Sequence, residues 1–149
     1  MKPGLAIGQT QTIEIEVTPD MVAYFEGELV HNLYSTSVLV QHMEMAARRL
    51  LVPFLSDNEE AMGCNFEIAH LAMTLPGMSV QIEATIVEIR DNKVVTNIEA
   101  SNIRGKIARG TVTQAIVDRD WLQNRMKEIS VIHNIATEKH SRSQAAYAS

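Results

Sequence analysis

Three side chains with reactive groups are spaced along the first half of the chain: the hydroxyl of Thr36, the carboxylate of Glu44 and the imidazole of His70. A threonine hydroxyl can attack a carbon centre or hold a water molecule, and a carboxylate can orient a histidine or attack by itself. A histidine, whose ordinary pKa is about 6.5, exchanges protons near neutral pH. These are the groups of nucleophilic and general acid–base catalysis.

Each of these residues also has a purely structural explanation. Thr36 lies in a run of hydroxyl residues at 35–37 where a helix is expected to begin, and such hydroxyls usually cap the helix. His70 lies on an apolar face, where a histidine is more often part of a satisfied core. Glu44 is harder to explain in this way, because a carboxylate between two methionines is costly to bury without a partner.

The stretch from residue 33 to residue 51 contains the predicted long central helix, which should begin at the hydroxyl cluster 35–37. It should end near Pro53, since the residue before a proline disfavours the helical conformation. Upstream, residues 12–17 alternate as a half-buried strand, residues 18–27 are predicted to form a short helix, and residues 28–35 a loop. The apolar stripe of the long helix recurs at steps of three and four residues and consists of Leu39, Met43, Ala46, Ala47, Leu50 and Leu51.

Beyond an acidic loop at 56–60 the hydrophobic period changes to that of strands. The alternation predicts strands at 62–74, 79–90, 94–101 and 106–117, joined by tight turns. Gly110, inside the last strand, is expected to mark a bulge. A helical period then returns, and this helix is expected to bury its apolar stripe against the sheet or a second protomer. The stripe consists of Trp121, Leu122, Met126 and Ile129.

These patterns divide the chain into four parts: a flexible arm at 1–11, a single folded domain at 12–118, a C-terminal helix at 119–136 and a disordered tail at 137–149. One long helix followed by consecutive antiparallel strands predicts an α+β domain whose curved sheet wraps that helix. Such a sheet has open edges, and pairing two of them edge to edge predicts a homodimer or a higher assembly.

Composition limits the classes of function. The chain has 149 residues, 46% of them hydrophobic, and a net charge of −5, so no basic surface indicates a nucleic-acid partner. No run approaches the ~20 apolar residues of a membrane helix, and the N-terminus does not resemble a signal peptide. The single cysteine, Cys64, excludes an internal disulfide, fits a cytoplasmic location and is expected to be a small buried apolar residue. We expect no metal, because His42 and Glu44 face different ways on a helix.

The order of elements, together with these residues, resembles the hotdog fold and, more narrowly, the fluoroacetyl-CoA thioesterase-like family. The resemblance rests on residues 34–40 (Tyr-Ser-Thr-Ser-Val-Leu-Val) followed by Glu44, on Gly63 at the start of a strand, and on His70, six residues before Pro76. It covers roughly residues 12 to 118, about one domain. It implies a long central helix wrapped by a curved antiparallel sheet of five strands, with the C-terminal helix added.

The resemblance also implies an activity, a dimeric acyl-CoA thioesterase that needs no cofactor beyond the CoA of its substrate. Thr36, Glu44 and His70 are then catalytic, and the Gly63 amide donates a hydrogen bond to the developing oxyanion. A glycine suits that role because it has no Cβ atom, so the substrate can approach its backbone closely. Tyr34 and Cys64, which lie beside these motifs, are expected to line the substrate site.

One position departs from the family. Its members often carry a histidine or arginine on the last strand, whereas this strand reads Gly-Thr-Val-Thr-Gln from Gly110 to Gln114. The thioester carrier, CoA or a carrier protein, is therefore left open. A different class of function is left open too: a non-catalytic hotdog module that binds an acyl or aromatic ligand or a partner protein. The plain last strand and the extra C-terminal helix favour this alternative, and the set of Thr36, Glu44 and His70 favours the enzyme.

The spacing of Thr36 and Glu44 bears on how a site would assemble. On one helix, residues eight apart are separated by ~12 Å along the axis and ~80° around it. They cannot share one hydrogen-bonded arrangement within a protomer if both lie on the helix. In a two-fold dimer, the start of one long helix approaches the middle of the other. We therefore predict a composite site with Thr36 from one chain, Glu44 from its partner and His70 between them.

Overall fold

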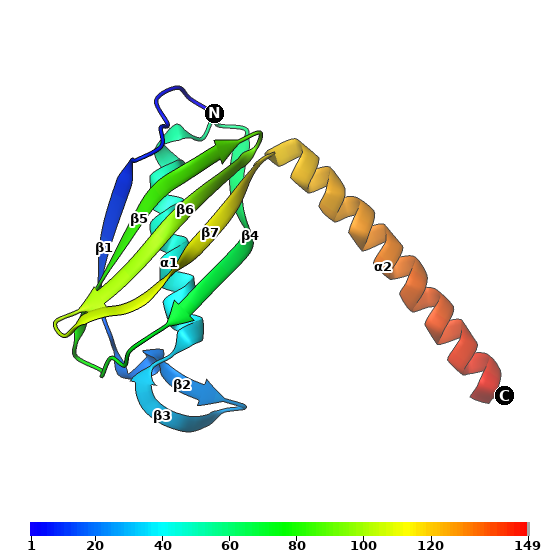
Figure 1. The fold of residues 1–149 in the computed structure, drawn as a ribbon. Helices are drawn as coiled ribbons and strands as arrows, with labels where there is room; N and C mark the ends of the chain where they lie inside the picture. The colour runs from blue at the N-terminus through cyan, green and yellow to red at the C-terminus, as the bar shows by residue number, and fades with distance from the viewer. Residues whose placement is uncertain (149) are drawn as a thin grey trace.

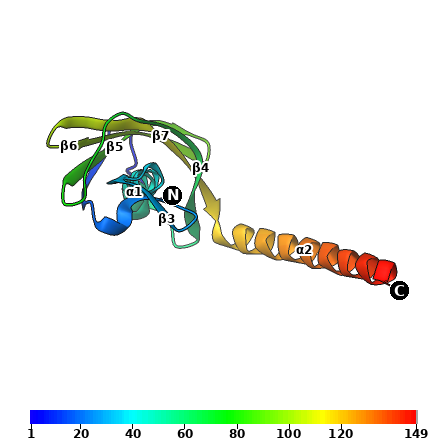
Figure 2. The same cartoon turned by 90° about the horizontal axis from the view of Figure 1, so that it is seen from below.

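A single long helix, α1 (Thr36–Leu51), lies in the hollow of a curved antiparallel sheet (Figures 1 and 2). This computed structural model describes residues 1–148. The sheet has the order β1-β5-β6-β7-β4, and the predicted helix wrapped by five strands is confirmed. The strands are β1 (Thr10–Glu16), β4 (Glu59–His70), β5 (Ser79–Arg90), β6 (Lys93–Asn102) and β7 (Gly105–Asp118).

The core forms where the apolar stripe of α1 meets the inner face of the sheet. The buried residues of α1 are the six that its period predicts: Leu39, Met43, Ala46, Ala47, Leu50 and Leu51. Opposite them, Ile82, Ile86 and Ile98 of the sheet are at most 1% exposed. Burying each large aliphatic side chain contributes about 1.5–3 kcal/mol, so this seam holds the helix in place. The helix gives way at Leu51 to the short 3-10 helix η2 (Val52–Phe54), which contains Pro53.

The segment before α1 is a hairpin, so the predicted short helix and loop are wrong. Only the 3-10 helix η1 (Pro19–Met21) is helical there, and β2 (Val22–Phe25) and β3 (Glu28–Tyr34) pair antiparallel beyond it. Glu26 and Gly27 between them have φ angles of 53° and 79°. Positive φ at both central residues is the requirement of a tight hairpin turn that matches the twist of its strands. The hairpin lies beyond the N-terminal end of α1 (Figure 1).

The predicted turns between β5, β6 and β7 are confirmed, but the predicted bulge at Gly110 is wrong. Gly110 pairs in register with Ile98 on one side and Ile68 on the other. A Cβ atom there would overlap the backbone carbonyl of Glu67, so close approach of two strands requires this glycine. The irregularity in β4 lies instead between Gly63 and Asn65.

The first residues, predicted to be a flexible arm, are tied to the domain. The amide of Lys2 donates to the carbonyl of Phe54 at 2.7 Å, and the amide of Gly8 donates to the carbonyl of Ile86 at 2.8 Å. Pairing with β5 begins at Thr10, before the predicted boundary. Backbone hydrogen bonds of this kind leave little signal in side-chain periodicity, which explains the error.

The C-terminal helix α2 (Arg119–Ala148) is longer than predicted and points away from the sheet (Figures 1 and 2). Residues 137–148 continue the helix, so the predicted disorder is wrong for them, and residue 149 lies outside the described residues. Glu, Lys, Arg, Gln and Ala are strong helix formers, which explains why a polar segment remains helical.

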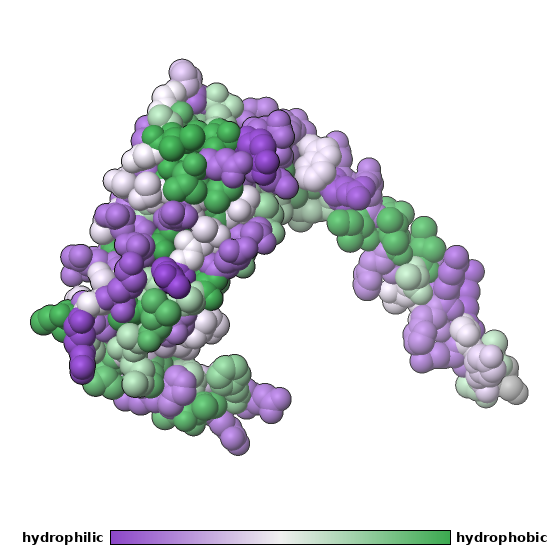
Figure 3. Space-filling view, in the orientation of Figure 1, coloured by the Kyte–Doolittle hydropathy of each residue, from purple (hydrophilic) through white to green (hydrophobic). Residues whose placement is uncertain are grey.

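No residue of α2 within the described chain is buried, so the predicted packing of its stripe on the chain's own sheet is wrong. Figure 3 shows a hydrophobic patch on this exposed helix. No helix among residues 1–148 is long and apolar enough to span a membrane.

Candidate functional site

Thr36 and His70 meet where the start of α1 approaches the end of β4. Thr36 Oγ1 lies 2.8 Å from His70 Nδ1. The expected capping role of Thr36 is wrong, because Ser35 is the N-cap and its Oγ accepts a hydrogen bond from the Val38 amide. With the cap supplied by its neighbour, the Thr36 hydroxyl is free to pair with the imidazole.

The other ring nitrogen of His70 is enclosed. Within residues 1–148, Nε2 has no hydrogen-bond partner. Burial lowers the pKa of His70 from its ordinary value, the backbone of Ala72 raises it in part, and the nearby His31 imidazole lowers it further. Because burial is the largest of these effects, the ring is neutral at pH 7. If the Thr36 hydroxyl donates to Nδ1, the ring carries its proton on Nε2.

The pair lines a cavity of about 610 Å³ between α1, the hairpin and the segment after β4. This volume lies in the range of small-molecule sites, which are typically apolar with a few polar groups. Besides Thr36 and His70, the walls contain Ala23, Phe25, His31, Leu33, Val40, Leu71 and Met73. The contribution of the hairpin to the cavity wall was not predicted from the sequence, because residues 18–35 were predicted to form a helix and a loop. The alternation of Val22, Tyr24 and the residues after Gly27 is the signal that points to strands.

Glu44 and Gly63 form a second pair, deeper along α1. A Cβ atom on Gly63 would lie 2.6 Å from Glu44 Oε1 and 2.7 Å from the ring of Phe66. The glycine thus provides the space that the carboxylate occupies. The Glu44 side chain is half-buried, and no hydrogen bond or ion pair joins it to any other described residue. The partner that its burial predicts is not found within residues 1–148.

The two pairs remain apart within one chain. Thr36, His70 and Tyr34 line the cavity, whereas Glu44, Gly63 and Cys64 do not. Eight residues of helix between Thr36 and Glu44 correspond to ~12 Å along the axis. The structure therefore joins Thr36 to His70 and Glu44 to Gly63 and leaves these halves unconnected in the protomer.

Comparison with known proteins identifies the family to which the chain belongs. The family model of the fluoroacetyl-CoA-specific thioesterase matches residues 17–120. A crystal structure of a thioesterase superfamily member from Thermus thermophilus has a TM-score of 0.85 and 32% identity, covering 89% of this chain and 98% of that one.

The chain belongs to the fluoroacetyl-CoA-specific thioesterase family.

Fluoroacetyl-CoA thioesterase of Streptantibioticus cattleyicolor is 22% identical over 134 residues, which cover 86% of this chain and 96% of that protein. A crystal structure of a fluoroacetyl-CoA thioesterase has a TM-score of 0.79 at 21% identity and covers 84% of this chain. At that identity the likeness shows the hotdog fold.

Tyr34, predicted to bind substrate in this thioesterase, is mostly a core residue. It is 2% exposed, and its hydroxyl lies 2.6 Å from His42 Nδ1. The rings stack with centroids 5.9 Å apart. Burial raises the pKa of Tyr34 and lowers the pKa of His42, so both are neutral at pH 7. This neutral pair braces the hairpin strand β3 against α1, behind the wall that carries Thr36.

Cys64, also predicted to bind substrate, is exposed, so its expected burial is wrong. It is the extra residue at the irregularity of β4, and its thiol lies 3.5 Å from the carbonyl of Thr113. A bulge leaves its extra residue out of the regular alternation, which is why the period of the strand misplaces it.

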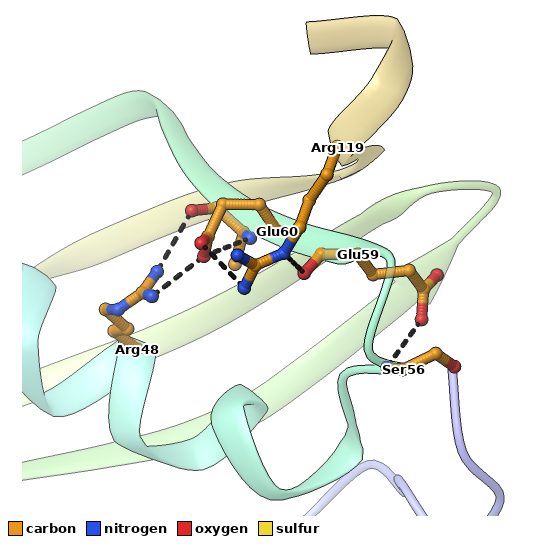
Figure 4. Close-up of polar contacts among 6 residues, drawn as sticks. Arg48, Ser56, Glu59, Glu60 and Arg119 are labelled. Atoms are coloured by element: carbon orange, nitrogen blue, oxygen red, sulfur yellow. Dashed lines mark hydrogen bonds and ion pairs between the residues drawn. The ribbon is translucent and has the colours of Figure 1, made fainter. Parts of the chain in front are cut away.

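A network of charged side chains fixes the base of α2 in the thioesterase (Figure 4). Glu60 lies between Arg48 at 2.8 Å and Arg119 at 3.3 Å, and Arg119 Nε donates to the carbonyl of Glu59 at 3.0 Å. The hydrogen bond from Arg48 holds the pKa of Glu60 below its ordinary value. Asp118 accepts a hydrogen bond from the amide of Trp121 at 2.9 Å. Helices α1 and α2 are thus both anchored to the start of β4.

Proposed function

We propose that the chain hydrolyses a small acyl-CoA thioester, with Thr36, Glu44 and His70 as catalytic residues and the Gly63 amide as oxyanion donor. The observation that carries this proposal is the 2.8 Å contact between Thr36 and His70 on the wall of a cavity of suitable size. Membership of a thioesterase family supports the reaction class. The acyl-CoA supplies both the acyl group and the leaving thiol, so no further cofactor is needed.

The proposed reaction assigns one task to each group. Glu44 removes a proton from water as its oxygen attacks the thioester carbon, and the Gly63 amide stabilises the oxyanion. The C–S bond then breaks, while the Nε2–H of His70 donates a hydrogen bond to the departing thiolate. Thr36, by donating to Nδ1, keeps the ring proton on Nε2. The thiolate takes, through solvent, the proton that Glu44 gained, which restores the Glu44 carboxylate, and acid and thiol are released.

A homodimer brings these tasks together. β4 is one of the two edge strands of the sheet, and it exposes the apolar side chains of Met62 and Phe66. Unpaired edges of this kind favour pairing with another strand. If β4 pairs antiparallel with its counterpart, the Gly63 end of one strand lies beside the His70 end of the other. Glu44 of one protomer then approaches the Thr36–His70 pair of its partner.

The location we propose is the cytoplasm. Cys64 is a free, exposed thiol, which is compatible with a compartment that keeps thiols reduced. The substrate we propose is likewise a metabolite of that compartment, a small acyl-CoA.

A panel of short-chain acyl-CoA and acyl-carrier-protein thioesters, assayed for free thiol, tests the reaction. We expect release from at least one acyl-CoA, and we expect His70→Ala to lower the rate by ~10²-fold or more. His133→Ala, on the exposed helix α2, is the matched control and should not change the rate. Loss of less than about tenfold in His70→Ala would make His70 structural. Tight binding of a thioester without thiol release would instead support the non-catalytic module.

Complementation tests the composite site. Thr36→Ala and Glu44→Ala proteins should each be inactive, and a mixture that exchanges subunits should regain activity. In a mixed dimer one of the two sites receives both intact residues, so about a quarter of wild-type activity is expected at equal mixing. Mixed dimers that are verified by mass and remain inactive would show that each site is built within one protomer.

A further inference from the structure

Gln114 of β7 is a buried amide whose carbonyl oxygen has no hydrogen-bond partner in the described chain. The residue is 1% exposed, and its Oε1 atom has no hydrogen-bond partner within residues 1–148. An enclosed acceptor without a donor is costly, and native proteins keep few of them. Its retention at this position therefore requires an explanation other than stability.

The register of the sheet places Gln114 beside Glu44. Gln114 pairs directly with Gly63 of β4. Residues directly opposite in an antiparallel pair point to the same face, with Cβ positions about 4.5–5.5 Å apart. A Cβ atom on Gly63 points at Glu44 Oε1, at 2.6 Å. The side chain of Gln114 thus stands on the inner face next to that carboxylate. Its other neighbour in the ladder, Val94, is in the core, which confirms the inward direction.

The Glu44 carboxylate and Gln114 Oε1 are two hydrogen-bond acceptors that no donor of the described chain, the amide nitrogen of Gln114 included, satisfies. A water molecule has two hydrogens and satisfies both acceptors at once. Both of its lone pairs then stay free, and one of them can attack a carbon centre. We propose that Gln114 is a positioning residue that holds the hydrolytic water against Glu44. This inference rests on the proposed function. It adds no new chemical step: Glu44 takes the water proton, and Gln114 fixes the direction of the attacking oxygen.

Thr96 supplies a matched control in the same sheet. Its hydroxyl is also enclosed and without a hydrogen-bond partner in the described chain, and the residue is 0% exposed. It pairs with Val112 and Ile86, however, and not with the glycine that faces Glu44. Replacement of Thr96 therefore removes an equally buried polar atom from the same inner face without changing the residue opposite Gly63.

The test compares Gln114→Leu with Thr96→Val on whichever thioester the wild-type protein cleaves best. Gln114→Leu should lower kcat at least tenfold, leave KM within about twofold and not lower the melting temperature, because the lost acceptor had no partner. Thr96→Val should leave kcat unchanged. A kcat within threefold of wild type in Gln114→Leu overturns the inference. So does an effect confined to KM, which would place Gln114 on the substrate.

Gln114→Glu keeps the proposal testable if the leucine variant does not fold. A protonated carboxyl at this position retains the carbonyl acceptor, whereas an ionised one repels Glu44. The pH profile of kcat should therefore gain a falling limb as pH rises, and a profile parallel to that of wild type overturns the inference. If wild-type protein releases thiol from no thioester, the proposed function fails and this inference falls with it. If wild type is active and both Gln114 variants match it, only the inference fails.

Discussion

Helices α1 and α2 both carry an apolar stripe, which is weaker in α2, and they have opposite surroundings. Of the 16 residues of α1, six are buried. Of the 30 residues of α2, none is buried in the described chain, and Trp121, Met126, Ile129 and Ile132 are each more than half exposed. A helical period predicts which face of a helix is apolar, but it contains no information about what will cover that face.

The cover depends on where the chain goes next. After α1, the chain returns as β4 and then builds the rest of a sheet around the helix. No element of the described residues covers α2, and the charge network of Arg119 and Glu60 directs the helix outward from the start of β4 (Figure 4). α1 is therefore a rigid platform for Thr36 and Glu44, whereas α2 is a projection beside the edge that we propose for the dimer.

The largest expected effect on stability comes from placing the same substitution, methionine to aspartate, in each of the two helices. Met43 in α1 is 0% exposed and Met126 in α2 is 54% exposed. Met43→Asp places a carboxylate in the core and should prevent folding, because burial of an unpaired charge costs several kcal/mol. Met126→Asp should change the free energy of unfolding by less than about 0.5 kcal/mol in the monomer.

Urea titrations followed by circular dichroism measure both variants under dilute conditions that favour the monomer. Similar losses of stability in the two variants would contradict the comparison and would mean that α2 folds back on its own domain.

A smaller effect concerns what covers the stripe of α2 in solution. Trp121 is the only tryptophan, and it is 55% exposed in the single chain. Its helix starts beside β4, so a second copy that pairs with β4 would lie on that side. We expect Trp121 emission to shift to shorter wavelength as protein concentration rises through dimer formation. Emission that stays like that of free tryptophan while the mass doubles would leave α2 uncovered in the dimer.

Sequence periodicity was sufficient for the central seam of the fold. The six buried residues of α1 and the order of β5, β6 and β7 were predicted because one face is apolar and the turns have strong signals. The hairpin β2–β3 was not predicted, since its turn has Glu26 before the glycine in place of the usual asparagine or aspartate. The apolar period also did not reveal that residues 137–148 continue the helix, because a polar segment without an apolar stripe resembles a disordered tail even where its helix propensity is high.

The site shows the same division. Thr36 and His70 were selected for their chemistry and do contact each other, 34 residues apart in sequence. The choice of Ser35 as the cap was not predictable, because any of three neighbouring hydroxyls could have served. In the sequence, Gln114 stood out only because the segment that it ends lacks a basic residue. Its position opposite Gly63 depends on strand register. A bulge at Cys64 shifts that register by one residue, which period alone does not reveal.

The smallest expected effect comes from the end of α2. Truncation after Ala136 removes residues 137–149, of which 137–148 have exposed side chains, and leaves the contacts of Arg119 with Glu59 and Glu60 intact. No buried contact is lost, so the melting temperature should stay within about 2 °C of wild type, less than the shift that ~1 kcal/mol produces in a chain of this size. The oligomeric state should not change either.

Truncation after Asp118 is the contrasting variant, since it also removes Arg119 and its ion pair with Glu60. It should lower the melting temperature more than truncation after Ala136. Differential scanning calorimetry and light scattering distinguish the two truncations. A clear drop in melting temperature on the shorter deletion would show that residues 137–148 pack on a surface, which in the described chain can belong only to a second copy.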